Sequence, residues 1–182
     1  MNYLIGAAAV IITAILAVSV LALRKPDEFV VRRTKAINAA PEAIFPHIND
    51  LRRWEAWSPY LKKYPAMKGR YSGAASGAGA VYEFEGNKEV GKGKVTITDS
   101  TPSSRIALQL DMIEPFAARN QVEFTLKPNG HDTQVTWSMS GKNNFFGKIA
   151  SVFLDMDRMI GKDFDNGLND LKIIMEKQGG HG

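Results

Sequence analysis

Thr133-Gln134-Val135-Thr136-Trp137-Ser138-Met139-Ser140 decides the fold, because apolar and polar side chains alternate along it without a break. A period of two is typical of a β-strand that buries one face. Val135, Trp137 and Met139 would share the buried face, and the residues between them are all polar. The stretch therefore predicts a sheet that is apolar on one side and wet on the other.

Similar extended patterns recur in six more runs, which turn residues such as Pro102, Pro115 and Pro128-Asn129-Gly130 separate. These runs cover residues 29–37, 67–71, 80–85, 91–98, 105–112 and 118–127. Short strands at such regular spacing indicate a meandering antiparallel sheet rather than alternating strand–helix–strand units. We therefore expect seven strands in one curved sheet.

Helical signals lie in two places. Asn38-Ala39-Ala40-Pro41-Glu42 begins a short helix, and residues 51–57 form a second one that Ser58-Pro59 ends. Near the C-terminus, apolar residues recur every three or four positions, namely Met156, Ile160, Phe164, Leu168, Leu171 and Met175. This is one long amphipathic helix, and only the apolar side of the sheet can cover its apolar face. The fold class is α+β.

The N-terminal segment is predicted to be a transmembrane helix. From Tyr3 to Leu23 there are 21 residues without a charge, and a helix of that length covers the roughly 30 Å of a bilayer core. A cleaved signal peptide fits less well, because no basic residue precedes the segment and its apolar run is too long. We expect a single anchor with its basic flank at residues 1–25 and one folded domain at residues 26–182.

Basic residues follow the predicted anchor. Residues 24–35 hold five basic and two acidic side chains, which account for most of the chain's net charge of +4. The positive-inside rule then places the membrane-attached C-terminal domain in the cytoplasm. The remainder is nearly neutral, so a membrane surface is expected as a partner and nucleic acid is not.

Several kinds of catalytic centre are excluded. The chain has no cysteine, so disulfides, thiolate nucleophiles and sulfur-ligated metals are absent. His47, His131 and His181 lack metal-ligand spacing, and neither a metal nor a cofactor is expected. The glycine-rich residues 72–79 lack the Gly-Lys-Ser/Thr of a phosphate-binding loop.

Glu83 and Glu85 have the spacing of paired catalytic carboxylates. They share their face of the sheet with Lys92 and Lys94 of the next strand, however. We interpret the four residues as cross-strand ion pairs.

The order of these elements resembles the helix-grip plan of the START-like (SRPBCC) superfamily, in its polyketide cyclase/dehydrase branch. The resemblance covers Phe29 to Lys177. The segments that carry it are Ile37-Asn38-Ala39-Ala40-Pro41-Glu42-Ala43-Ile44-Phe45, Trp54-Glu55-Ala56-Trp57-Ser58-Pro59, Gly91-Lys92-Gly93, Thr133-Gln134-Val135-Thr136-Trp137-Ser138-Met139-Ser140-Gly141 and Gly167-Leu168-Asn169-Asp170-Leu171-Lys172.

The resemblance implies a hydrophobic cavity between the concave sheet and the last helix, which would hold a lipid, a polyketide or another lipophilic small molecule. Periodicity by itself leaves open whether this space is packed solid or hollow. The positions that would bind the ligand are Trp57, Tyr82, Phe84, Leu108, Leu110, Phe124, Trp137, Met139, Met156, Ile160 and Phe164.

Two other functions stay open. One is an enzyme of cyclase or dehydrase type, and the other is a non-catalytic interaction domain that uses the exposed face of the sheet. An enzyme needs an inward polar group, and the inward face offers only Tyr82 and the Trp137 indole. Tyr60, Arg119 and Asn120 are further candidates for such a group, but no catalytic residue is assigned.

Overall fold

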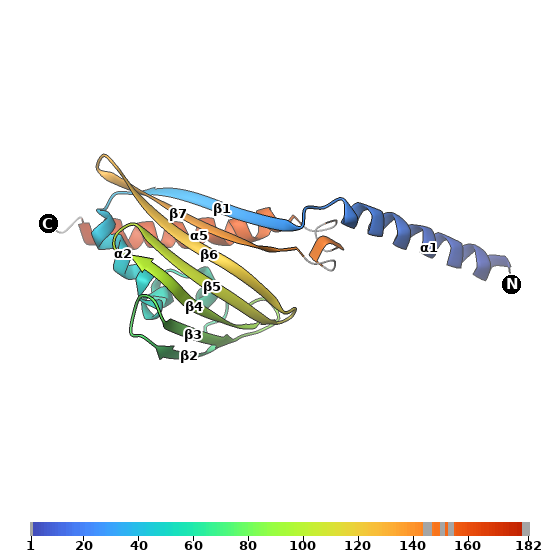
Figure 1. Ribbon diagram of the computed structural model, residues 1–182, viewed down its shortest axis with the longest axis horizontal. Helices are drawn as coiled ribbons and strands as arrows, with labels where there is room; N and C mark the ends of the chain where they lie inside the picture. The colour runs from blue at the N-terminus through green and yellow to red at the C-terminus, as the bar shows by residue number, and fades with distance from the viewer. Residues whose placement is uncertain (1, 144–146, 150–151, 153–154, 180–182) are drawn as a thin grey trace.

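A computed structural model describes residues 2–143, 147–149, 152 and 155–179, and its centre is one seven-stranded sheet (Figure 1). All pairings are antiparallel, in the order β1-β7-β6-β5-β4-β3-β2. The strands are β1 (Glu28–Ile37), β2 (Lys68–Gly73), β3 (Ala80–Glu85), β4 (Lys92–Thr101), β5 (Arg105–Glu114), β6 (Ala118–Asn129) and β7 (Asp132–Lys142). The predicted meander and the number of strands are confirmed.

The helices also follow the prediction, with one difference. They are α1 (Asn2–Leu23), α2 (Pro41–Asn49), the 3₁₀ helix η1 (Leu51–Ala56), α3 (Pro59–Lys63) and α5 (Met156–Gly179). The extra helix is α3: Pro59 starts it, whereas the sequence predicted that Ser58-Pro59 only ends a helix. A proline at the first helical turn loses no hydrogen bond there, so the same residue can close one helix and open another.

The transmembrane helix predicted within residues 1–25 is not supported. Among the residues that the structure describes, no helix combines the length and the apolar character that crossing a bilayer requires. The location of the domain stays a prediction.

The sheet is bent, and α2, η1, α3 and α5 lie on its concave side, whereas α1 extends away from the sheet (Figure 1). The ladder between β4 and β5 shifts register between Ile97 and Asp99, and the extra residue of such a bulge bends the strand. The helix α5 runs along β1 and β7 (Figure 1). The helix α2 contacts η1 and β6, η1 contacts β3, and α3 contacts both η1 and α5.

Close contacts place α5 on the sheet. At Gly167 an added Cβ would lie 2.8 Å from Cζ3 of Trp137 and 2.9 Å from Cδ of Pro59, so only glycine allows this approach. On β1, Arg33 reaches the same helix, with Nη2 3.0 Å from Asp157 Oδ2 and Nε 3.3 Å from Asp165 Oδ2. The predicted contact between the last helix and the sheet is confirmed.

The interior beneath the middle of the sheet is densely packed. Trp57, Phe124 and Phe164 are at most 1% exposed. The rings of Trp137 and Phe164 stack with centroids 4.1 Å apart, and those of Trp57 and Phe124 meet edge to face at 6.0 Å. Aromatic side chains from the end of η1, from the sheet and from α5 therefore fill the space between the sheet and α5 here. Periodicity alone left open whether this space is packed or hollow.

Candidate functional site

The concave face of the sheet is sealed toward one end and open toward the other. On β4 and β5, Ile97 and Leu108 are fully buried. One row further along the same face, Val95 and Leu110 are only half-buried. A curved sheet thus presents accessible apolar side chains that α5 and the short helices leave uncovered.

These open positions belong to one row that crosses the sheet, which we call the concave row. Its members pair from strand to strand across β2, β3, β4, β5 and β6, and they are Tyr71, Tyr82, Val95, Leu110 and Asn120. The middle of the row is aliphatic and each end is polar. Such a surface suits a molecule that is apolar along most of its length.

A pocket lies at the β2 end of the concave row. It has a volume of about 400 Å³ and is lined by Glu55, Leu61, Pro65, Met67, Gly69, Tyr71 and Tyr82. Its walls come from η1, from α3 with the segment after it, from the edge strand β2 and from its neighbour β3. This volume falls within the range of small-molecule sites.

Glu55 and Tyr71 form the polar wall of this pocket. The Tyr71 hydroxyl donates a hydrogen bond to Oε1 of Glu55, with 3.2 Å between the oxygens. The Tyr71 ring stacks on Tyr82 with centroids 4.6 Å apart, and the Arg52 guanidinium carbon lies 5.1 Å from the Tyr71 ring centroid. Stacking and the cation–π contact hold Tyr71 in place.

Tyr82 is the most enclosed residue of the pocket, at 8% exposed. Its ring fits only because position 69 is glycine: a Cβ there would lie 2.5 Å from the Tyr82 hydroxyl oxygen. In the part of the chain that the structure describes, no hydrogen bond engages this hydroxyl. A phenol that is so enclosed and has a free donor and acceptor is suited to bind a ligand.

Both tyrosines stay protonated well above neutral pH. Burial first, and then the charge of Glu55, raises the pKa of Tyr71 above its ordinary value. The same two causes, in the same order, raise the pKa of Tyr82. The pocket therefore offers one carboxylate acceptor and two neutral hydroxyl groups at physiological pH.

These shifts predict a loss of stability at alkaline pH. Because folding raises the pKa of Tyr71, its contribution to stability is complete below the ordinary tyrosine pKa of about 10 and declines as the pH rises above it. We expect phenolate absorbance at 295 nm to appear for Tyr71 at a higher pH than for free tyrosine. Glu55→Gln should move this titration to lower pH, and Tyr71→Phe should remove it. An unchanged titration curve in Glu55→Gln would contradict the contact between the two side chains.

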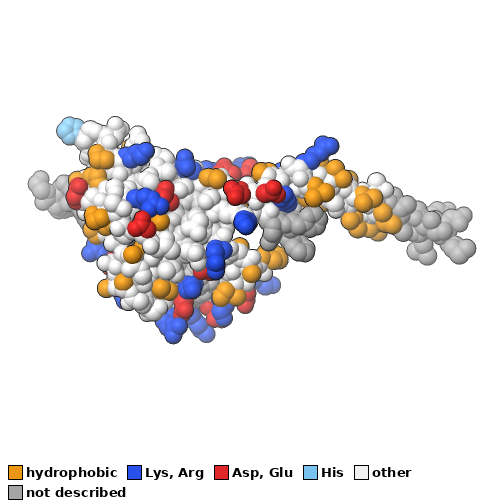
Figure 2. Space-filling view, viewed as in Figure 1, with side chains coloured by type: hydrophobic (Ala, Val, Ile, Leu, Met, Phe, Trp, Pro, Cys, Tyr) orange, Lys and Arg blue, Asp and Glu red, His pale blue; other side chains and the backbone are white. Residues whose placement is uncertain are grey.

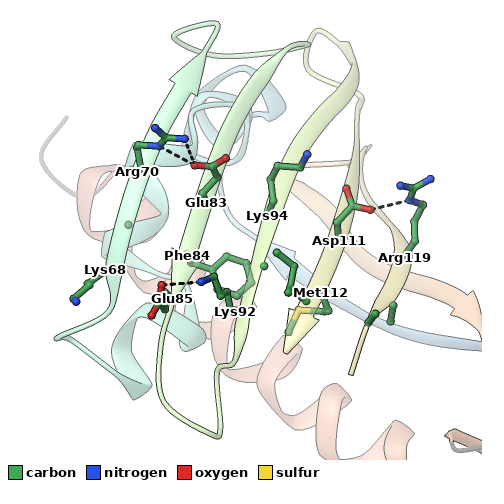
Figure 3. A pocket seen from close by; sticks show the side chains of 15 residues that line it. Lys68, Arg70, Glu83, Phe84, Glu85, Lys92, Lys94, Asp111, Met112 and Arg119 are labelled. Atoms are coloured by element: carbon green, nitrogen blue, oxygen red, sulfur yellow. Dashed lines mark hydrogen bonds and ion pairs between the residues drawn. The ribbon is translucent and has the colours of Figure 1, made fainter. Parts of the chain in front are cut away.

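A second, larger pocket of about 980 Å³ adjoins the first at Gly69, which lines both. The pocket is lined by three residues at each of the strands β2, β3, β4, β5 and β6, where Ala117, directly before β6, is counted with that strand (Figure 3). One row of these residues carries alternating charges: Arg70, Glu83, Lys94, Asp111 and Arg119. The alternation matches opposite charges on neighbouring strands and needs no ligand to explain it.

Two ion pairs of Glu83 and Glu85 refine the interpretation that the sequence suggested for these residues. Glu85 pairs with Lys92 as predicted, at 3.1 Å. Glu83, however, pairs with Arg70 of β2 at 2.6 Å, although Lys94 lies opposite it in register. On its β2 side Glu83 meets the guanidinium of Arg70, whose planar set of donors matches a carboxylate better than the ammonium of a lysine does. Figure 2 shows such charges of both signs interspersed toward the β2 edge.

The residues predicted to bind a ligand fall into three groups. Tyr82 lines the smaller pocket and Phe84 the larger one. A second group lies in the sealed core, namely Trp57, Leu108, Phe124, Trp137, Met139 and Phe164. The rest are half-buried near the open end or on α5: Leu110, Met156 and Ile160. The structure thus brings the two aromatic residues of β3 to the pockets and places the other aromatic residues in the core.

The three polar candidates also separate. Arg119 is exposed and pairs with Asp111 at 2.8 Å. Asn120 lies at the far end of the concave row, 8% exposed, with its amide against Gly141. Tyr60 packs against the core, and burial followed by the charge of Asp163 raises its pKa. Of these three, Arg119 lines the larger pocket, and Tyr60 and Asn120 line neither pocket.

No metal centre is found in the described part of the chain: no group of three or more His, Cys, Asp or Glu side chains gathers there. The Trp57 indole donates to the carbonyl of His47 at 3.0 Å, and His131 is exposed. His181 lies outside the described residues.

Sequence reasoning missed Glu55 and Tyr71. Alternation within the run 67–71 places Met67, Gly69 and Tyr71 on one face, so Tyr71 could have been added to the inward residues. Glu55 had no such signal, because it stands between Trp54 and Ala56 in a short 3₁₀ helix. Only the tertiary structure reveals that this helix contacts β3.

Comparison with known proteins agrees with this fold. A family profile described as "Polyketide cyclase / dehydrase and lipid transport" matches residues 28–176. No curated protein sequence gives a significant match.

Three solved structures illustrate the similarity. Protein CV1439 from Chromobacterium violaceum is 15% identical, with a TM-score of 0.59 over 84% of this chain and 99% of that one. The Aha1 dimer from Colwellia psychrerythraea is 17% identical, with a TM-score of 0.58 over 81% and 96% of the two chains. DynU16, from the dynemicin biosynthetic locus, is 17% identical, with a TM-score of 0.55 over 84% of this chain and 48% of its own. At these identities the likeness concerns the fold alone.

Proposed function

Because the chain belongs to the polyketide cyclase/dehydrase and lipid transport family, we propose that it binds a lipophilic small molecule on the open half of its concave face. The observation that carries the proposal is the half-buried aliphatic middle of the concave row, Val95 and Leu110, beside a pocket of about 400 Å³. A ligand that covers these side chains gains roughly 25 cal/mol for each Å² of apolar surface removed from water.

The packed core favours the open half of the concave face, rather than the centre of the sheet, as the place where the ligand binds. Trp57, Phe124 and Phe164 leave no exposed surface for a guest to contact. In the proposal these residues keep the sheet rigid, while β2, β3 and the concave row supply the binding surface. A rigid scaffold beside an open apolar surface limits the entropy that binding costs.

The test is saturable binding of a fluorescent lipophile, N-phenyl-1-naphthylamine, to the purified chain. We expect its emission to rise and saturate with a single site. Leu110→Asn should weaken binding by about tenfold or more, since an amide without a partner under the ligand costs about 1–3 kcal/mol.

The matched control is Val30→Asn, which makes a similar change at an exposed position of β1. It should leave probe binding within about twofold. If Leu110→Asn fails to fold, Val95→Thr takes its place in the test, because threonine has nearly the shape of valine but carries a hydroxyl group. An absence of saturable binding in the unaltered chain would overturn the proposal, as would equal binding by both asparagine variants.

A catalyst of cyclase or dehydrase type is the second candidate function. One observation favours it: the Glu55 carboxylate and the Tyr71 hydroxyl lie 3.2 Å apart in the wall of a pocket. A carboxylate and a phenol can move protons to and from a bound carbonyl compound. Loss of turnover of a polyketide-like substrate in Glu55→Gln, with binding intact, would support this second candidate.

A further inference from the structure

The proposed function leaves open which lipophiles the site accepts, and the polar wall of the smaller pocket bears on this question. Resting on that function, we infer that Glu55, Tyr71 and Tyr82 recognise a hydroxyl group, so that the preferred ligands are phenols or alcohols of otherwise apolar structure.

The first step is the supply of an acceptor. Tyr71 donates to Oε1 of Glu55, but a carboxylate has about four lone-pair positions and one hydrogen bond fills only one of them. Glu55 is exposed toward the pocket side of η1 and has no ion pair with a described residue. Its second oxygen can therefore accept a hydrogen bond from a ligand.

The second step is the supply of a donor. Tyr82 is 8% exposed and lines the same pocket. Its hydroxyl has no hydrogen-bond partner among the described residues. This hydroxyl is therefore available to donate to a ligand oxygen that enters the pocket. A ligand hydroxyl can donate to Glu55 and accept from Tyr82 at the same time.

The third step excludes competing ligand classes. A carboxylate ligand would meet the negative charge of Glu55, and a hydrocarbon would leave the second oxygen of Glu55 and the Tyr82 hydroxyl without a partner. The Tyr71 ring is already in contact with Tyr82 and Arg52, so an organic cation finds this aromatic face occupied. A neutral hydroxyl group is the remaining match for one acceptor and one donor.

The experiment compares two probes that share one ring system, 2-naphthol and 2-methoxynaphthalene, by isothermal titration with the full chain. We expect 2-naphthol to bind about tenfold more tightly, because only it can donate to Glu55. Glu55→Gln should reduce this preference to about twofold or less while 2-methoxynaphthalene binds as before. Tyr82→Phe should weaken both probes, because the oxygen of each can accept a hydrogen bond from Tyr82. Glu42→Gln, an exposed glutamate on α2, is the matched control and should keep the full preference.

The outcomes separate this inference from the proposed function. Equal affinity for the two probes would overturn hydroxyl recognition and leave lipophile binding intact. Failure of both probes to bind would overturn both. A preference for 2-naphthol that survives in Glu55→Gln would overturn the assignment to Glu55, and unchanged affinity of both probes for Tyr82→Phe would overturn the assignment to Tyr82. Tyr82→Phe removes only one oxygen, so it tests the inference even if a larger change impairs folding.

Discussion

Replacing Trp137 or Trp57 with alanine is expected to lower the free energy of unfolding by about 3–5 kcal/mol. Trp57 is fully buried and Trp137 is 2% exposed, and each packs edge to face or stacked against two or more aromatic rings. Truncation leaves a cavity in a region where rigid rings cannot collapse into it. Urea denaturation of each variant measures the loss.

Phenylalanine at the same positions gives the matched comparison. The Trp57 indole donates to the His47 carbonyl at 3.0 Å, whereas Nε1 of Trp137 is buried without a partner among the described residues. Trp57→Phe should therefore cost about 1 kcal/mol more than Trp137→Phe, since it strands a buried carbonyl. If both alanine variants lost less than about 1.5 kcal/mol, the packed core described above would be wrong.

Leu168→Asp is expected to destabilise the domain by more than about 4 kcal/mol and to abolish its cooperative unfolding. Leu168 is fully buried on the face of α5 that covers the sheet. The change would bury a charge that has no partner, and a domain of this size is stable by only about 5–15 kcal/mol. Circular dichroism during thermal unfolding provides the measurement.

Asn169→Asp is the control, because it introduces the same side chain one position further along on the exposed side of α5. Its free energy of unfolding should change by no more than about 0.5 kcal/mol. A similar stability for the two aspartate variants would show that α5 does not seal the sheet.

Most of the fold could be predicted because it depends on local patterns. Alternation identified each strand to within a few residues, and Pro128-Asn129-Gly130 marked the last hairpin. Pro59 was harder to interpret, since a proline both ends one helix and begins another. For the N-terminal segment the local pattern predicted a transmembrane helix, which the described residues do not support.

The candidate site could be predicted only in part. Tyr82 and Phe84 were identified by alternation and do line pockets. The family resemblance also assigned Trp57, Phe124 and Phe164 to the ligand, although their rings fill the core. Alternation tells which face a side chain occupies. It does not tell how many other side chains compete for the space in front of it.

By itself, the sequence determined the strands, the long helix and the apolar face that joins them, because spacing along the chain dictates which side chains share a face. The tertiary structure decided where that face is full and where it is open, and it placed Glu55 of η1 against Tyr71 of β2. The physical reason is that both outcomes depend on distances between segments far apart in the chain. Those distances follow from the bend of the sheet and from the close approach that Gly69 and Gly167 permit.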